Sequence, residues 1–283
     1  MKIPEFVPKS VVFVGAPALK ACKKQDYLSG TGFFVGRVSA RVDAAHVYIV
    51  TARHVIDGTA SVTGGLVYFC VNHRDWGRQW IETQSTDWIR GDSDIDVAVL
   101  PFTPAVNNID HTVIPGYAIV SQGNLRSGGY SLELGDEVGI SGLFVHHAGE
   151  NRNTPIVRIG NLATGLEKNV SAKLGDNWYG KINAYLIEAR SIGGLSGSPV
   201  FVHRVDDGMP KYALLGLMQG HYGLKLVDSP ADMPNDTSIN SGIGIVVPVD
   251  DIERVFNLPE ILEMEKLHED GMLSRNGAEA DIR

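Results

Sequence analysis

Short apolar segments separated by glycine-rich turns are the feature of this sequence that most limits its fold. The segments are rich in Val, Ile, Leu and Phe, and glycine supplies 32 of the 283 residues. They lie at residues 11–16, 32–38, 46–52, 66–71, 96–102, 137–145, 155–160, 181–189, 198–203, 212–218 and 242–249. Segments of this length and punctuation are typical of antiparallel barrels or sandwiches rather than of βαβ units. The sequence therefore predicts a mostly β protein.

A polar stretch containing Pro and Gly divides these segments into two groups. Because the chain is longer than an average single domain, we expect two lobes on either side of that stretch. The predicted boundaries are residues 1–105 for the N-terminal lobe, 106–129 for a linker and 130–250 for the C-terminal lobe. Residues 251–283 are expected to form C-terminal helices and a tail that frays, since the last residues have little apolar content.

Charge and cysteine content argue against several classes of partner. The formal net charge is −8 and no cluster of Lys and Arg is present, so we expect no nucleic-acid partner. No apolar stretch approaches twenty residues, so we expect no membrane partner either. The only cysteines are Cys22 and Cys70, which are too few for a disulfide framework and favour a reducing, cytoplasmic location. One bridge between the two stays open as an alternative.

The segment GGLSGSPVF at 193–201 places a serine inside a glycine-dense turn that leads into an apolar strand. Glycines permit backbone conformations closed to other residues and let a substrate carbonyl approach the chain closely. Such a turn can direct the N–H groups of Gly194 and Ser196 toward one point, as an oxyanion hole requires. The segment resembles the nucleophile motif GxSG(G/S)P of the chymotrypsin-fold serine peptidases. The resemblance implies that Ser196 is the nucleophile and that Gly194 and Ser196 form the oxyanion hole.

A serine nucleophile needs a general base and an orienting carboxylate, and motifs for both precede the serine. The segment TARH at 51–54 resembles the histidine motif T-A-x-H of the same family, which implies that His54 is the base. The segment DVAVL at 96–100 resembles the family's aspartate motif, which implies that Asp96 orients the imidazole. The two separations along the chain are 42 and 100 residues. The order His, Asp, Ser is that of chymotrypsin, whose separations are about 45 and about 93.

The resemblance extends over most of the chain. GTGFFV at 30–35 is similar to the strand before the histidine, and LGDEVGISG at 134–142 is similar to the opening of the second barrel. GIGIVVPVDDI at 242–252 is similar to the last strand and helix of HtrA-type members. The chain is thus identified as a trypsin-like serine peptidase of the HtrA and glutamyl-endopeptidase branch. That implies two six-stranded antiparallel β-barrels followed by C-terminal helices, with His54 and Asp96 in the first barrel and Ser196 in the second.

Other acidic and histidine residues offer alternatives to this assignment. Asp92 and Asp94 compete with Asp96 for the orienting role, but only Asp96 directly precedes the apolar run VAVL. The cluster DSDID also resembles the start of a calcium loop, yet the glycine and glutamate that such a loop requires are missing. His146 and His147 have no carboxylate or cysteine partner at ligand spacing. We therefore predict no metal site and no cofactor.

The pocket for the side chain before the scissile bond is placed only by the resemblance. In this family it is lined by the segment ahead of the nucleophile and by the strand after it. These positions correspond here to Arg190, Ile192, Met218, Gly220 and His221. An Arg190 that points inward would favour cleavage after Asp or Glu, because its guanidinium binds a carboxylate in two places. If Arg190 points to solvent instead, the pocket would accept a medium apolar side chain.

Two functions from different classes follow from these motifs. The first is a serine endopeptidase that cleaves a protein or peptide substrate through an acyl-enzyme. The second is a protease-fold binding module that is catalytically silent or whose activity is gated by a regulatory protein partner. An esterase on the same fold is a third, weaker alternative, since a triad does not choose between amide and ester substrates.

Overall fold

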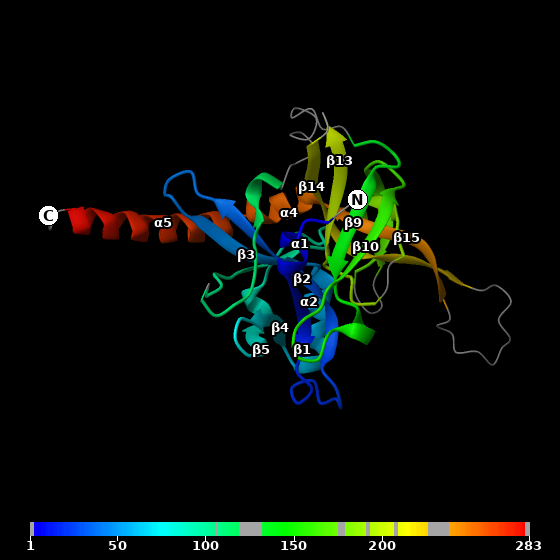
Figure 1. The fold of residues 1–283 in the computed structure, drawn as a ribbon, viewed down its shortest axis with the longest axis horizontal. Helices are drawn as coiled ribbons and strands as arrows, with labels where there is room; N and C mark the ends of the chain where they lie inside the picture. The colour runs from blue at the N-terminus through cyan, green and yellow to red at the C-terminus, as the bar shows by residue number, and fades with distance from the viewer. Residues whose placement is uncertain are drawn as a thin grey trace.

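The fold of the chain is that of a computed structural model. It describes residues 3–105, 107–118, 132–174, 179–190, 193–206, 209–225 and 238–280. Figure 1 shows strands of two sheets making up most of the body, with helices beside them. The chain is therefore mostly β, as predicted. None of the helices in the described part of the chain is long and apolar enough to span a membrane.

The first sheet has eight strands and comes from the N-terminal part of the chain. Its strand order is β5-β4-β1-β2-β3-β7-β6, and β8 adds to β2. The strands are β1 (Val11–Ala16), β2 (Tyr27–Val38), β3 (Ala45–Thr51), β4 (Leu66–His73), β5 (Gly77–Gln84), β6 (Ile89–Arg90), β7 (Ala98–Pro101) and β8 (Ile114–Pro115). All pairings are antiparallel except that of β8 with β2. Strands β6 and β8 have only two residues each, and the eight-residue strand β5 is mostly polar. None of the three was predicted, so this sheet exceeds the six strands expected.

The second sheet has seven strands in the order β10-β9-β13-β14-β15-β12-β11. They are β9 (Glu137–Gly142), β10 (Ile156–Leu162), β11 (Glu167–Lys173), β12 (Tyr179–Glu188), β13 (Pro199–Asp206), β14 (Met209–Lys225) and β15 (Ser238–Pro248). An additional pairing of β10 with β12 joins the ends of a run of six strands. The expected six-stranded arrangement is thus present here, and β11 extends it as a seventh strand. The predicted linker boundary at 106–129 stays a prediction, because residues 106 and 119–129 lie outside the described residues.

Four α-helices lie within the described residues. They are α1 (Phe6–Lys9), α2 (Arg53–Thr63), α4 (Val249–Phe256) and α5 (Pro259–Ala280). The two C-terminal helices were expected, but α5 continues to Ala280 through most of the segment that we expected to fray. Helix α2 was not predicted, since only Val55, Ile56 and Thr59 are buried along its eleven residues. Cys22 is exposed and Cys70 buried, and both are free, so the open alternative of a bridge between them is not realised.

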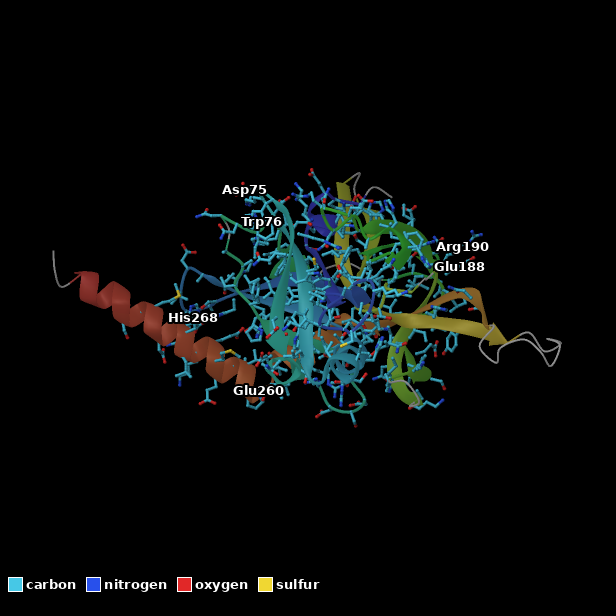
Figure 2. All side chains as sticks on the ribbon, turned by 90° about the horizontal axis from the view of Figure 1, so that it is seen from below. Asp75, Trp76, Glu188, Arg190, Glu260 and His268 are labelled. Atoms are coloured by element: carbon cyan, nitrogen blue, oxygen red, sulfur yellow. The ribbon has the colours of Figure 1, made fainter. Side chains whose placement is uncertain are left out.

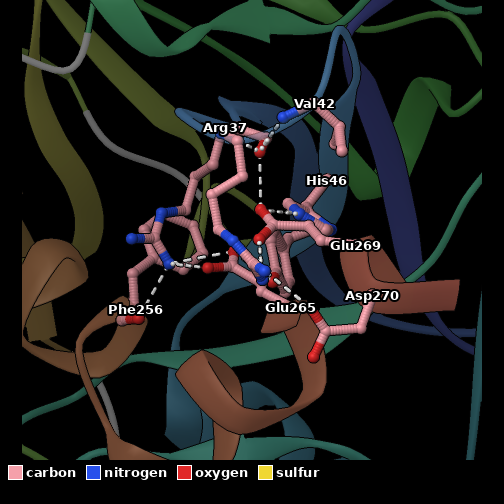
Figure 3. Close-up of polar contacts among 10 residues, drawn as sticks. Arg37, Val42, His46, Phe256, Glu265, Glu269 and Asp270 are labelled. Carbon is pink, nitrogen blue, oxygen red and sulfur yellow. Dashed lines mark hydrogen bonds and ion pairs between the residues drawn. The ribbon is translucent and has the colours of Figure 1, made fainter. Parts of the chain in front are cut away.

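Helix α5 extends away from the body of the molecule, and Glu260 and His268 mark its start and middle (Figure 2). Three of its carboxylates, those of Glu265, Glu269 and Asp270, hold it to β2, β3 and the loop between them (Figure 3). Glu265 accepts hydrogen bonds from Arg37 and from the Tyr48 hydroxyl, at 3.0 and 2.6 Å. Glu269 accepts hydrogen bonds from Ser39, at 2.6 Å, and from Arg41, at 3.1 Å, and its carboxylate also contacts His46. The attachment of α5 to the first sheet therefore includes several polar contacts, beside the buried side chain of Ile261.

Candidate active site

His54 comes three residues after the end of strand β3. Ala52 is extended and precedes α2, which places His54 in the first turn of a helix instead of the tight turn expected from the motif. The first N–H groups of a helix have no partner within the helix. The backbone N–H of His54 is satisfied by the carboxylate of Asp96, at 2.9 Å from Oδ1. The same carboxylate therefore orients both the start of the helix and the imidazole.

Asp96 is brought to His54 by the pairing of two strands. Thr51 of β3 lies opposite Ala98 of β7, and Asp96 comes two residues before that position. Its Oδ2 lies 2.7 Å from Nδ1 of His54, and its side chain is only 1% exposed. Asp92 and Asp94 are exposed and face Arg254, each at 3.9 Å. Of these three carboxylates, that of Asp96 is the one that contacts the imidazole.

The surroundings of His54 set its protonation. Burial lowers the pKa of His54, but the charge of Asp96 and its hydrogen bond raise that pKa by more. The charge of Asp57 adds a smaller rise, and Lys173 has the opposite effect because its positive charge disfavours the imidazolium. The net result is a pKa of His54 above its ordinary value.

Ser196 lies in a turn that only glycines can shape. Gly194 and Gly197, on either side of it, have φ values of +98° and +83°, where side chains other than hydrogen are strained. The Ser196 hydroxyl donates to the backbone carbonyl of Gln219 on β14, at 2.9 Å. Within the described residues, no hydrogen bond joins that hydroxyl to His54. The Ser196 hydroxyl is therefore bonded to strand β14 and not to the imidazole.

The backbone of this turn has the donors that an oxyanion hole needs. Among described residues, neither the N–H group of Gly194 nor that of Ser196 donates to a protein acceptor. The next N–H group, that of Gly197, donates to the carbonyl of Met218 at 2.6 Å. The strand β14 therefore fixes the exit of the turn and leaves the two N–H groups before it unused.

The residues expected to line the substrate pocket are placed unevenly. Arg190 is exposed and lies at the surface near Glu188 (Figure 2). Met218 is fully buried, Gly220 is half-buried and His221 is exposed. Ile192 lies outside the described residues. The exposure of Arg190 agrees with the alternative in which this side chain turns to solvent.

Three residues near the site were missed from the sequence. Thr31, at the centre of GTG, bonds directly to the nucleophile turn. Gln219 is buried and donates its side-chain amide to the carbonyl of Lys173, which connects β14 to β11. Lys173 could not be placed near the site from the sequence, because strand β11 has a weak apolar pattern and was not predicted. For Thr31 a signal was available, since it lies in the segment GTGFFV, which was interpreted only as the strand before the histidine.

Three comparisons with known proteins bear on the fold and the family of this chain. A search among proteins of curated function finds no match. Among solved structures, the active form of the Rv3671c protease from M. tuberculosis is 17% identical, with a TM-score of 0.50, over 88% of this chain and 80% of that one. The MamO protease domain from Magnetospirillum magneticum is 17% identical, with a TM-score of 0.49, over 88% and 97%. Human heparin binding protein is 12% identical, with a TM-score of 0.47, over 92% and 96%.

A family model gives the stronger result. The model of the trypsin-like peptidase domain matches residues 30–205, which is well over half of the chain and includes His54, Asp96 and Ser196. Members of such a family act on peptides. The two sheets, the histidine–carboxylate contact and the glycine-shaped serine turn lie within or beside the matched region. The chain therefore belongs to the trypsin-like peptidase domain family.

Proposed function

We propose that this protein is a serine endopeptidase in which Ser196 is the nucleophile, His54 the general base and Asp96 the orienting carboxylate. The observation that carries the proposal is the contact between His54 and Asp96, at 2.7 Å, within a peptidase domain. It is supported by the unused N–H groups of Gly194 and Ser196 in the adjacent turn.

The reaction follows from these groups. The Ser196 hydroxyl leaves the Gln219 carbonyl and turns to His54 Nε2, which accepts its proton as Oγ attacks the carbonyl carbon of the substrate. The N–H groups of Gly194 and Ser196 hold the negative oxygen that forms. When the C–N bond breaks, the imidazolium gives its proton to the leaving amine. Water then attacks the acyl-enzyme, with His54 again taking and returning a proton, and releases the acid.

A gated protease-fold module is the second candidate, and one observation favours it. The Ser196 hydroxyl donates to Gln219 and not to His54, so the resting arrangement needs a side-chain rotation before chemistry. In ligand-free peptidases the catalytic hydrogen bonds are often long or misaligned, so this arrangement is also compatible with an active enzyme. The two candidates differ in whether the isolated protein reacts.

Labelling with a fluorophosphonate tests the proposal, since the reagent needs an activated serine and an open oxyanion site. We expect wild-type protein to be labelled and to cleave peptides from a random library. Ser196→Ala should lose labelling and about 10⁴- to 10⁶-fold in kcat. Ser198→Ala is the matched control, because the hydroxyl of Ser198 is buried without a hydrogen-bond partner in the described structure. Folded wild-type protein that stays unlabelled would exclude a constitutively active enzyme and leave the gated module.

A further inference from the structure

Thr31 of β2 is buried in the contact between the two sheets and uses all of its polar groups. Its side chain is 0% exposed. Its hydroxyl donates to the carbonyl of Gly194 at 2.7 Å and accepts a hydrogen bond from the backbone N–H of Leu143 at 2.9 Å. Leu143 follows β9, so a single hydroxyl joins the first sheet, the second sheet and the nucleophile turn. Buried polar groups that are fully paired fix one arrangement of the elements they join.

The backbone of Thr31 makes two more contacts with the same site. Its N–H donates to the carbonyl of Ser196 at 2.8 Å. Its carbonyl accepts a hydrogen bond from the hydroxyl of Thr51 at 2.6 Å, and Thr51 ends the strand that leads to His54. Thr31 therefore connects the segment of the proposed nucleophile with the segment of the proposed base.

The positions of these bonds define what Thr31 holds. Its hydroxyl fixes the peptide group after Gly194, and its N–H fixes the peptide group after Ser196. Between them lies the peptide group whose N–H belongs to Ser196. A turn rich in glycine has little conformational preference of its own, so its orientation must come from such outside contacts.

Neighbouring glycines show how closely the chain approaches Thr31. A Cβ on Gly197 would lie 2.0 Å from the carbonyl oxygen of Thr31. A Cβ on Gly142 would lie 2.9 Å from its hydroxyl oxygen and closer still to the hydroxyl of Ser198. Both distances are too short for real contacts. The space around Thr31 thus requires glycine on both sides, which leaves its hydroxyl in direct contact with the turn.

We propose that Thr31 is a positioning residue that holds the oxyanion turn in its reactive orientation through the hydrogen bond from its hydroxyl to Gly194. The inference rests on the proposed function, because it concerns the rate of the reaction at Ser196. Without this hydroxyl, the Gly194 carbonyl and the Leu143 N–H lose their partner, and the turn is free to rotate at Gly194. Transition-state stabilisation falls while substrate contacts elsewhere remain.

The test compares Thr31→Val, which keeps the shape and removes the hydroxyl, with Thr31→Ser, which keeps the hydroxyl. Thr59→Val is the matched control, since Thr59 is equally buried and its hydroxyl donates only to the Val55 carbonyl within α2. We measure kcat, KM, the rate of fluorophosphonate labelling and the melting temperature, with all rates taken well below each melting temperature. Removing an oxyanion donor costs about 10²- to 10³-fold in kcat, so loss of its support should cost about 10- to 100-fold.

We expect Thr31→Val to lower kcat and the labelling rate together with little change in KM, and Thr31→Ser to restore both. Thr59→Val should lower the melting temperature alone. If Thr31→Val does not fold, Thr31→Cys replaces it, and its weak S–H donor should give an intermediate loss. A Thr31→Val or Thr31→Cys enzyme with wild-type kcat, or a Thr31→Ser enzyme as slow as Thr31→Val, would overturn the inference. Wild-type protein that is neither labelled nor active would instead refute the proposed function, and the inference with it.

Discussion

Replacing Gly197 with alanine tests whether the nucleophile turn is held by the close approach of the first sheet. Gly197 has a φ of +83°, and an added Cβ would lie 2.0 Å from the Thr31 carbonyl oxygen and 2.4 Å from the Thr51 hydroxyl oxygen. A positive φ costs an L-residue about 1–2 kcal/mol. Forcing an extra methyl group into a packed site costs about 1–3 kcal/mol more. We therefore expect the free energy of unfolding to fall by about 2–5 kcal/mol.

The measurement is urea or thermal unfolding of Gly197→Ala beside Gly64→Ala. Gly64 has a φ of +72° after α2, but an added Cβ there would meet no atom within 4 Å. Gly64→Ala thus contains the backbone strain without the steric contact, and its free energy of unfolding should fall by only about 1–2 kcal/mol. Gly197→Ala should also lose fluorophosphonate labelling at temperatures where it is folded. Equal destabilisation in the two variants would refute the close-approach argument.

Four further predictions concern charge and attachment. Asp96→Asn should lower kcat by about 10⁴-fold because the amide sets the wrong imidazole tautomer, whereas Asp92→Asn, at an exposed side chain, should leave kcat near wild type. Because the pKa of His54 is raised and the base must be neutral, kcat/KM should increase with pH through a midpoint above about 6.5, and a midpoint below that value would contradict the assignment. Lys173→Gln removes a positive charge that lowers the pKa of His54, so the midpoint of the kcat/KM profile should move to higher pH. An unmoved or lower midpoint would contradict an effect of Lys173 on His54. Glu269→Gln should speed hydrogen exchange in α5, because three side chains contact that carboxylate; unchanged exchange would show that α5 is held elsewhere.

Much of the fold was predictable because its strands are short, apolar and separated by glycine. The strands that escaped prediction, such as β5 and β11, lie at the edges of their sheets and expose many of their side chains. An edge strand has one neighbour to pair with and less apolar surface to bury, so its sequence carries little hydrophobic signal. Helix α2 escaped for a related reason, since few of its residues are buried.

The candidate site was predictable where local sequence carries chemistry, and only there. The motifs around His54, Asp96 and Ser196 are contiguous, and the pairing of β3 with β7 explains why two of them meet. The resting contact of Ser196 with Gln219 is a bond between side chain and backbone across 23 residues, and backbone acceptors leave no trace in the sequence. Thr31 bonds to a turn 163 residues away through a hydroxyl that also suits an ordinary strand.

The contacts that attach α5 to the first sheet were the least predictable feature of the fold. They also reach the strand that leads to His54. Its carboxylates pair with residues more than 200 positions away in β2, β3 and the loop between them. Charged residues on a helix normally indicate a solvated face, so no sequence pattern marks the half-buried Glu265 or the buried Glu269 as partners of the first sheet. Yet the hydroxyl of Tyr48 donates to Glu265 three residues before Thr51, in the strand that delivers His54. Strand β3, which leads to the proposed base His54, is therefore held by two contacts. Glu265 of the C-terminal helix bonds to Tyr48 within the strand, and Thr31 bonds to Thr51 at its end.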